Sequence, residues 1–226
     1  MSLSSYTALR DAVIGDAHNS WLHRSAISGD LFNNFLQLTE EKMYIGGMLS
    51  TGRHVSGLRV RHMEKRSTAT LSTSSRFLAL PDNFLEARRA ELEYIDSNSN
   101  KIVYPLKFVV PSELREADIS SLPTRFTVTS QYEFDVTPDL AYTMEVQHYA
   151  KASAITSSNT TGTLLTAYPS IYLYGCLYHG AMWADEPQKA IMFNDMFLDA
   201  INDANTNDRW ARVGPAPQAI YHGSTP

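Results

Sequence analysis

Apolar residues recur with a helical period at both ends of the chain. They form one stripe in residues 5–20 and another in residues 30–45, where Gly46-Gly47 then ends the pattern. Residues 169–184 are apolar on two sides, and the segment from Pro187 to about residue 208 has one clean apolar face. A period near 3.6 residues indicates a helix, and a helix that is apolar on two sides is buried on two sides. The pattern therefore predicts two helices near each terminus.

Residues that suit helix starts stand at the beginning of these segments. Ser4 or Ser5 is the expected N-cap of the first helix, and Asp30 that of the second. Pro169 and Pro187 fit a first helical turn, because a proline there lacks only an N–H that would have no partner. The inward positions expected for the last helix are Ala190, Phe193, Phe197, Ala200, Ile201 and Ala204.

Between the helical segments, apolar and polar residues alternate with a period of two. Such alternation predicts antiparallel strands with one buried and one solvated face. The alternating segments are residues 58–62, 88–94, 126–128, 132–136 and 142–148. Turn residues occupy 81–83, 96–100 and 137–139, and residues 111–117 suit one short helix. Residues 155–163 are rich in Ser, Thr and Asn and are expected to form a loop with no packing role.

These elements predict an α+β fold. Amphipathic helices bury their stripes against one another, so we expect an antiparallel bundle of two N-terminal and two C-terminal helices. An antiparallel β-rich region is inserted between the two pairs. We assign residues 1–50 and 165–212 to the bundle, residues 51–164 to the insertion, and residues 213–226 to an extended C-terminal tail.

The composition is that of an ordered globular protein, with 226 residues, 43% of them hydrophobic and 19% charged. The single cysteine, Cys176, excludes an internal disulfide and reads as a small buried apolar residue. The N-terminal residues lack the basic-then-apolar pattern of a secretion signal. No run approaches the roughly 20 apolar residues that span a bilayer, so no membrane partner is expected.

The charge is negative overall but unevenly placed. A net charge of −5 argues against tight binding to nucleic acid. Basic residues gather between positions 53 and 66, and acidic residues populate the last helix. They are two solvated faces, or they are complementary surfaces for head-to-tail association of subunits. The candidate interface residues are Arg53, Arg59, Arg61, Lys65, Arg66, Asp195, Asp199 and Asp203.

No pattern in the sequence points to catalysis or to a cofactor. The closest histidines, His18 and His23, are five residues apart, which does not place two imidazoles on one helical face. There is no nucleophile elbow, no phosphate-binding glycine loop and no Cys/His pattern. The protein is therefore expected to be neither an enzyme nor a metalloprotein.

The C-terminal helical hairpin resembles that of head–tail adaptor proteins of tailed phages. The resemblance rests on the segment YPSIYLYGCLYHGAMWADEPQKAIMFNDMFLDAINDAN (168–205) and on the basic residues Arg209 and Arg212 that end the last helix. Upstream, FLALPDNFL (77–85), PSEL (111–114) and residues 142–149 resemble further parts of that family, in the same order. The likeness covers about residues 75–212.

Membership of that family implies a structural role in the virion. Such adaptors form a ring, usually of twelve copies, below the portal of the DNA-filled head. The ring extends the DNA channel and provides a platform for tail or nozzle proteins. The implied partners are therefore further copies of the chain, the portal protein, tail proteins, and double-stranded DNA that passes without specific binding. The implied location is the head–tail junction, with assembly in the host cytoplasm.

Two hypotheses about sites follow. In a closed ring each subunit presents two different surfaces, and the basic and acidic residues above are candidates for that pair. The tail from about residue 209 is a candidate for docking into the portal by ordering on contact. Its candidate docking residues are Arg209, Trp210, Arg212, Ile220 and Tyr221.

Three other functions remain open. The alternatives are a tail tubular or neck protein lower in the same tube, a small intracellular enzyme with an unrecognised site, and a nucleic-acid-binding module. Direct contact with the portal separates the adaptor from the neck protein. A deep pocket with convergent titratable groups favours the enzyme, and salt-sensitive DNA affinity favours the nucleic-acid-binding module.

Overall fold

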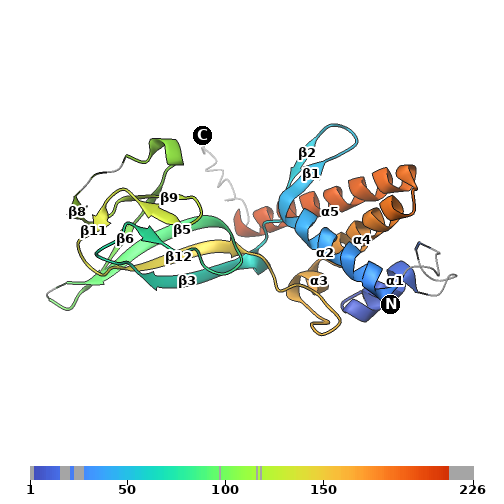
Figure 1. Ribbon diagram of the computed structural model, residues 1–226, viewed down its shortest axis with the longest axis horizontal. Coiled ribbons are helices and arrows are strands. Elements are labelled where there is room, and N and C mark those ends of the chain that lie inside the picture. Colours follow the sequence, from blue (N-terminus) through green and yellow to red (C-terminus); the bar gives the residue numbers. More distant parts are fainter. Residues whose placement is uncertain are drawn as a thin grey trace, which may run out of the picture. The chain divides into compact units, whose positions relative to one another are not determined.

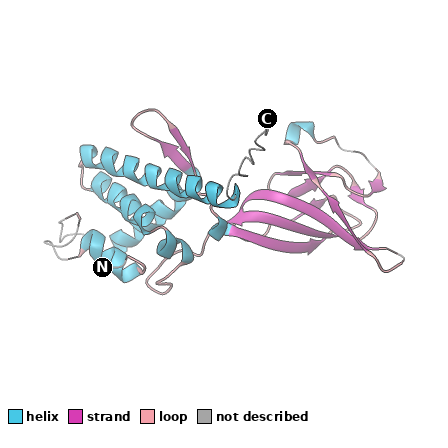
Figure 2. Ribbon diagram, turned by 180° about the vertical axis from the view of Figure 1, so that it is seen from behind, coloured by secondary structure: helices cyan, strands magenta, loops and turns pink. Residues whose placement is uncertain are grey.

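The computed structural model describes residues 3–15, 21–22, 28–96, 98–115, 117 and 119–213. The chain forms two compact units. The helical unit contains Met1–His62 and Ser153–Pro226, and the β unit contains Met63–Ala152. Figure 1 follows the chain through both, and Figure 2 separates its helices from its strands by colour. The α+β class is confirmed. Residues 51–62 and 153–164, which we assign to the β-rich insertion from the sequence, belong to the helical unit.

Five α-helices and one short hairpin make up the described part of the helical unit. The helices are α1 (Tyr6–Ile14), α2 (Gly29–Ile45), α3 (Thr163–Ala167), α4 (Pro169–Trp183) and α5 (Pro187–Val213). The strands β1 (Gly46–Met48) and β2 (His54–Ser56) pair antiparallel. The four helices expected from the apolar stripes are all present, and α5 ends at Val213, next to the bound of 212 expected for the bundle.

The N-caps of α1 and α2 are serines. The Oγ of Ser5 accepts a hydrogen bond from the N–H of Ala8, as expected for one of the two candidate residues. In α2 the cap is Ser28, whose Oγ accepts from the N–H of Leu31, so the expectation of Asp30 is wrong. Asp30 lies in the first turn instead, where its negative charge favours the positive end of the helix.

Helix α4 is the central element of the helical unit. It packs against the other four helices, and residues on opposite sides of it, such as Ile171 and Cys176, are fully buried. Gly175 permits the closest approach, because a Cβ there would overlap Cγ2 of Thr39 in α2. Burial raises the pKa of the Cys176 thiol to about 12, as expected for a cysteine that only fills space.

Glycine also ends α2 and starts the hairpin. Gly46 has φ of +84°, which side-chain-bearing residues rarely adopt, and a Cβ there would overlap the carbonyl oxygen of Val55 in β2. The helix stop expected at Gly46-Gly47 is therefore present. The hairpin that follows it was not predicted, because strands of three residues carry no periodic signal.

The β unit contains two four-stranded sheets. In the first, the order is β3 (Glu64–Thr70), β12 (Thr143–Ala150), β5 (Phe84–Ile95) and β6 (Lys101–Pro105), all antiparallel. In the second, the order is β4 (Phe77–Leu78), β10 (Tyr132–Phe134), β9 (Arg125–Val128) and β7 (Lys107–Phe108), with β7 parallel to β9. The short strands β8 (Ser120–Ser121) and β11 (Thr137–Pro138) form a parallel pair, and residues 111–113 form one 3₁₀ turn.

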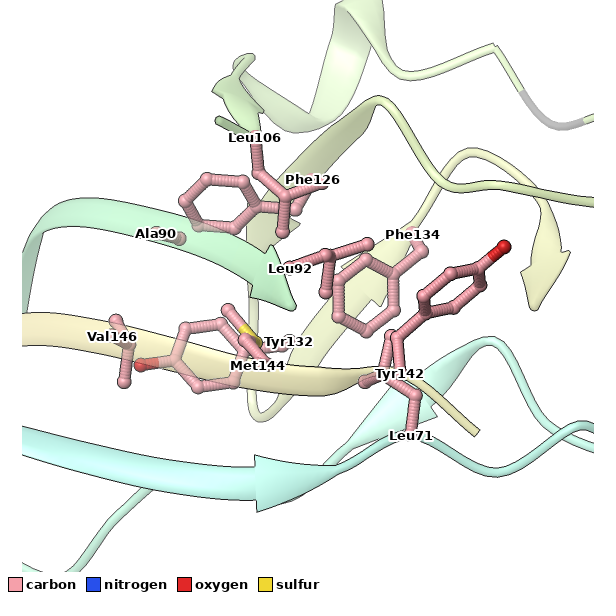
Figure 3. Packing of buried hydrophobic residues seen from close by; sticks show 10 residues of the cluster. All are labelled: Leu71, Ala90, Leu92, Leu106, Phe126, Tyr132, Phe134, Tyr142, Met144 and Val146. Atoms are coloured by element: carbon pink, nitrogen blue, oxygen red, sulfur yellow. The ribbon is translucent and has the colours of Figure 1, made fainter. Parts of the chain in front are cut away.

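The core of the β unit contains side chains from strands of both sheets. Figure 3 shows Met144 and Val146 of β12 and Leu92 of β5 near Phe126 and Phe134 of the second sheet. Thr143, Glu145 and Gln147 alternate with the buried residues of β12 and are partly solvated. Strands are therefore confirmed within residues 88–94, 126–128, 132–136 and 142–148.

The strand expected at residues 58–62 is absent. Leu58 and Val60 are fully buried, as alternation predicts, but residues 57–60 have no ladder partner in the described part of the chain, and a 3₁₀ turn begins at Arg61. Their backbone instead bonds to helices. The N–H of Leu58 donates to the carbonyl of Met43, and the N–H groups of Arg59 and Arg61 donate to side chains of α5.

The polar loop at 155–163 does have a packing role, contrary to expectation. Ile155 is buried, and its N–H donates to Oε1 of Glu40 in α2 at 3.0 Å. The carbonyl of Thr160 accepts from the N–H of Tyr6 at 2.7 Å. Burial raises the pKa of Glu40 to about 7, and the bond from Ile155 offsets part of that rise.

Replacing Glu40 with glutamine is expected to stabilise the protein at high pH. Because the folded pKa lies above the unfolded value of about 4.3, the wild type loses stability as the pH rises from about 4 to 7. Glu40→Gln keeps the acceptor for Ile155 without a buried charge, so it should be more stable by on the order of 1 kcal/mol at pH 8. The difference should vanish near pH 4. Denaturant unfolding at both pH values measures it, with the exposed Glu41→Gln as the matched control; equal effects of both substitutions would contradict the assignment.

Candidate assembly surfaces

Helix α5 binds the hairpin and the segment after it through a row of polar side chains. Asp195 accepts from the N–H of Ser50 at 2.9 Å and from its hydroxyl. Further along α5, Oδ1 of Asn205 accepts from the N–H of Arg59 at 2.8 Å, and the side-chain amide of Asn205 donates to the carbonyl of Gly57 at 3.2 Å. These bonds satisfy backbone groups that have no strand partner.

Asp208 is the most enclosed member of this row, with 4% of its surface exposed. Oδ1 accepts from the backbone N–H of Arg61 at 3.1 Å and from its Nε at 2.9 Å, and Oδ2 accepts from Nε of Arg212 at 2.6 Å. Burial opposes ionisation of Asp208. The hydrogen bonds from Arg61 and Arg212 outweigh that effect and hold the pKa of the carboxyl below its usual value.

The candidate interface residues are partly engaged within one chain. The guanidinium of Arg53 lies 3.3 Å from Asp199, and Arg61 binds Asp208. The guanidinium of Arg59 donates to the carbonyls of Tyr44 and Leu58. The two sets of opposite charge therefore already meet inside a subunit, which the sequence alone did not indicate.

Three candidate interface residues differ from the others. Lys65 and Arg66 lie in β3 of the β unit, where Arg66 pairs with Glu145 at 3.3 Å. Lys65 is exposed, and Asp203 is exposed on α5. A role of the eight residues between subunits stays a prediction.

The candidate docking residues fall into two groups. Arg209, Trp210 and Arg212 belong to the last turns of α5, so these three docking candidates are helical and not part of an extended segment. Arg212 binds Asp208, whereas Trp210 is 69% exposed. Ile220 and Tyr221 lie outside the described residues.

An open groove of about 590 Å³ lies where the hairpin meets α4 and α5. Met48, Met182 and Ile191 line it, each about half exposed or more. Lys42 lies 3.6 Å from the centre of the Tyr178 ring and donates to Oδ1 of Asn194 at 2.7 Å. Burial lowers the pKa of Lys42 to about 8. Exposed apolar side chains around a lysine that already has its own partners suit contact with another protein.

The outer face of the first sheet of the β unit is polar. Its charges pair as Arg66 with Glu145 and Lys101 with Glu93, at 3.3 and 2.6 Å, and as Arg89 with Glu91. Within the described ranges no three His, Cys, Asp or Glu side chains are grouped to hold a metal ion. Nor does a described helix have the length and apolar character to cross a bilayer.

Comparison with known proteins identifies the family. No curated protein matches the chain. The family described as SU10 adaptor protein matches residues 4–219, which is nearly the whole chain and extends well beyond the stretch of sequence resemblance. The chain therefore belongs to the SU10 adaptor family, whose members are structural head–tail adaptors of phages.

Proposed function

We propose that the protein forms a ring of twelve copies below the portal, extends the DNA channel and carries the tail. Its membership of an adaptor family is the observation that carries this proposal. The helices around α4 act in it as a rigid antiparallel bundle. Each subunit of a closed ring needs two unlike surfaces. Exposed side chains of the helical unit can form them.

Exposed apolar side chains support an assembled state. Met48, Met182, Trp183, Ile191 and Met192 of the helical unit are each 48–57% exposed. Met48, Met182 and Ile191 line the groove, and apolar groups around a groove commonly mark a contact with another protein. We assign this groove to contacts within the ring or with a neighbouring ring.

The charge of the chain suits a conduit for DNA. Each copy adds a net charge of −5, and a negative wall repels the phosphates of a passing duplex. The tail, residues 213–226 with Ile220 and Tyr221, docks into the portal in this proposal, and Trp210 flanks it at the end of α5.

The decisive measurement is the mass of the protein alone and mixed with the portal ring. Uptake of twelve copies by each portal ring is expected. Trp210→Ala should weaken that uptake about 10-fold, because an exposed aromatic side chain at an interface is a frequent hot spot. Thr206→Ala, at an exposed position one turn earlier, is the matched control and should leave uptake unchanged.

The same measurement tests the charged interface. Asp203→Lys reverses an exposed carboxylate and should reduce ring formation at low salt but not at high salt. Unchanged ring formation by this variant would show that Asp203 is not part of the interface. No binding of the wild type to the portal ring would refute the adaptor function itself and favour a position lower in the tube.

A further inference from the structure

We propose that neighbouring copies join their β units edge to edge, with β3 of one copy pairing with β6 of the next. The first sheets of all copies then form one continuous antiparallel sheet around the ring. This inference rests on the ring of the proposed function and adds the contact that closes it.

Both edges of the first sheet have free backbone groups. The sheet order makes β3 and β6 its two edges. The N–H of Leu71 donates to the carbonyl of Tyr142, so by antiparallel alternation the residues of β3 that point away from β12 are 66, 68 and 70. The N–H of Leu106 donates to the carbonyl of Ala90, so residues 101, 103 and 105 of β6 point away from β5. Within the described ranges no other strand pairs with either edge.

Because the sheet has an even number of strands, its two edges can pair antiparallel. Each neighbouring pair in β3-β12-β5-β6 is antiparallel, so β3 runs opposite to β6. Copies related by rotation about a ring axis have the same orientation, so β3 of the next copy is antiparallel to β6 of the first. The sheet therefore continues without a change of pairing type.

The faces of the sheet also match across this junction. Thr70 of β3, Thr143, Glu93 and Val103 of β6 are successive ladder partners, so they share one row and one face. The outward-pointing backbone groups of both edges belong to residues of this polar face. Pairing outward residues with each other keeps the polar faces of neighbouring copies together.

Part of each edge lacks the features that usually protect a sheet edge. Thr68, Ala69 and Thr70 are exposed and uncharged, and Val103 and Tyr104 are 42% and 38% exposed. Native edges are commonly blocked by charges or proline. In β3 the charges fill the first three positions, Glu64, Lys65 and Arg66, and in β6 Lys101 and Pro105 stand at the two ends. Residues 67–70 of β3 and the middle of β6 are open to another strand.

A second copy is the partner that fits both edges. The edges are unlike in sequence but complementary in direction and face, so β3-to-β6 pairing is heterologous and propagates around a ring. Pairing of β3 with β3 would give only dimers. An extended peptide from another protein would occupy one edge and would not link copies.

Engineered cysteines test the contact in assembled head–tail particles. A flat junction places Thr70 beside Val103, and a stagger of two residues, as in a tilted closed sheet, places Thr68 beside Val103. Hydrogen-bonded partners have Cα atoms about 5.5 Å apart, which a disulfide spans. Oxidation of Thr68→Cys/Val103→Cys or Thr70→Cys/Val103→Cys should give a ladder of cross-linked chains on a non-reducing gel. Cys176 contributes no background, because it is fully buried and its pKa is about 12.

Single and misplaced cysteines are the controls. Val103→Cys paired with Glu113→Cys, an exposed residue outside both edges, should remain monomeric on the gel. Dimers from Thr68→Cys alone would show β3-to-β3 pairing and overturn the inference. A ring that assembles while neither edge pair cross-links would overturn it too and would leave the adaptor function standing. Absence of the wild type from the particles would refute both.

A proline provides the second test. Val103→Pro removes an N–H that points away from its own sheet, so the monomer should keep its circular dichroism while ring formation is lost. Val103→Thr keeps the N–H and should assemble as the wild type does. Rings that form normally with Val103→Pro would contradict the edge contact.

Discussion

Replacing Gly175 with alanine is expected to destabilise the helical unit by about 3 kcal/mol, although alanine is the better helix former. The added Cβ would overlap Cγ2 of Thr39 and lie 3.0 Å from Cε2 of Phe197, and all three residues are enclosed between α2, α4 and α5. A close-packed interior relieves such an overlap only by moving a helix or distorting a rotamer. Denaturant unfolding followed by the helical circular dichroism signal measures the loss.

Two further variants separate overpacking from a general intolerance of alanine. Gly29→Ala, at the start of α2, has open space around its Cβ and should be neutral or slightly stabilising. Thr39→Ala removes the atoms that a Cβ at residue 175 would meet, so the double variant Thr39→Ala/Gly175→Ala should recover much of the stability. Strictly additive effects in this cycle would show that the two positions are not in contact.

Replacing Asp208 with asparagine is expected to cost about 2–3 kcal/mol at pH 7. The substitution leaves Arg61 and Arg212 without their carboxylate and weakens the tie between α5 and the segment before the β unit. Asp199→Asn is the matched control on the same helix. Its partner Arg53 and Asp199 itself are both more than half exposed, so that change should stay within about 0.5 kcal/mol.

The cost at Asp208 should depend on pH in one direction. Its folded pKa lies below the unfolded value of about 3.9, so the wild type binds fewer protons than its unfolded chain near that pH. The stability from Asp208 is therefore fully present above about pH 5 and is lost as the pH falls through the folded pKa. The gap between wild type and Asp208→Asn should narrow below pH 4. A gap that stays constant from pH 7 to pH 3 would show that the carboxylate charge does not contribute.

The local sequence pattern is enough to predict which faces of the helices and long strands are buried. The stripe of α5 from Ala190 to Ala204 and the alternation along β12 each repeat several times, so the local period reports burial. The helical hairpin at residues 168–205 also carries the resemblance to the phage adaptor family. Short or polar strands were not found, because the three residues of β1 and the sequence EKRSTAT of β3 carry no apolar period.

Which polar groups meet depends on the folded chain and not on the local pattern. Arg61 and Asp208 carry opposite charges and are 147 positions apart in the chain. They become partners because the segment after the β1-β2 hairpin packs against α5. The edges of the first sheet are likewise a property of strand order, which joins β3 to β12 across more than 70 residues. Periodicity is a local property of the chain, whereas ion pairs, caps and strand neighbours depend on distances that the complete fold sets.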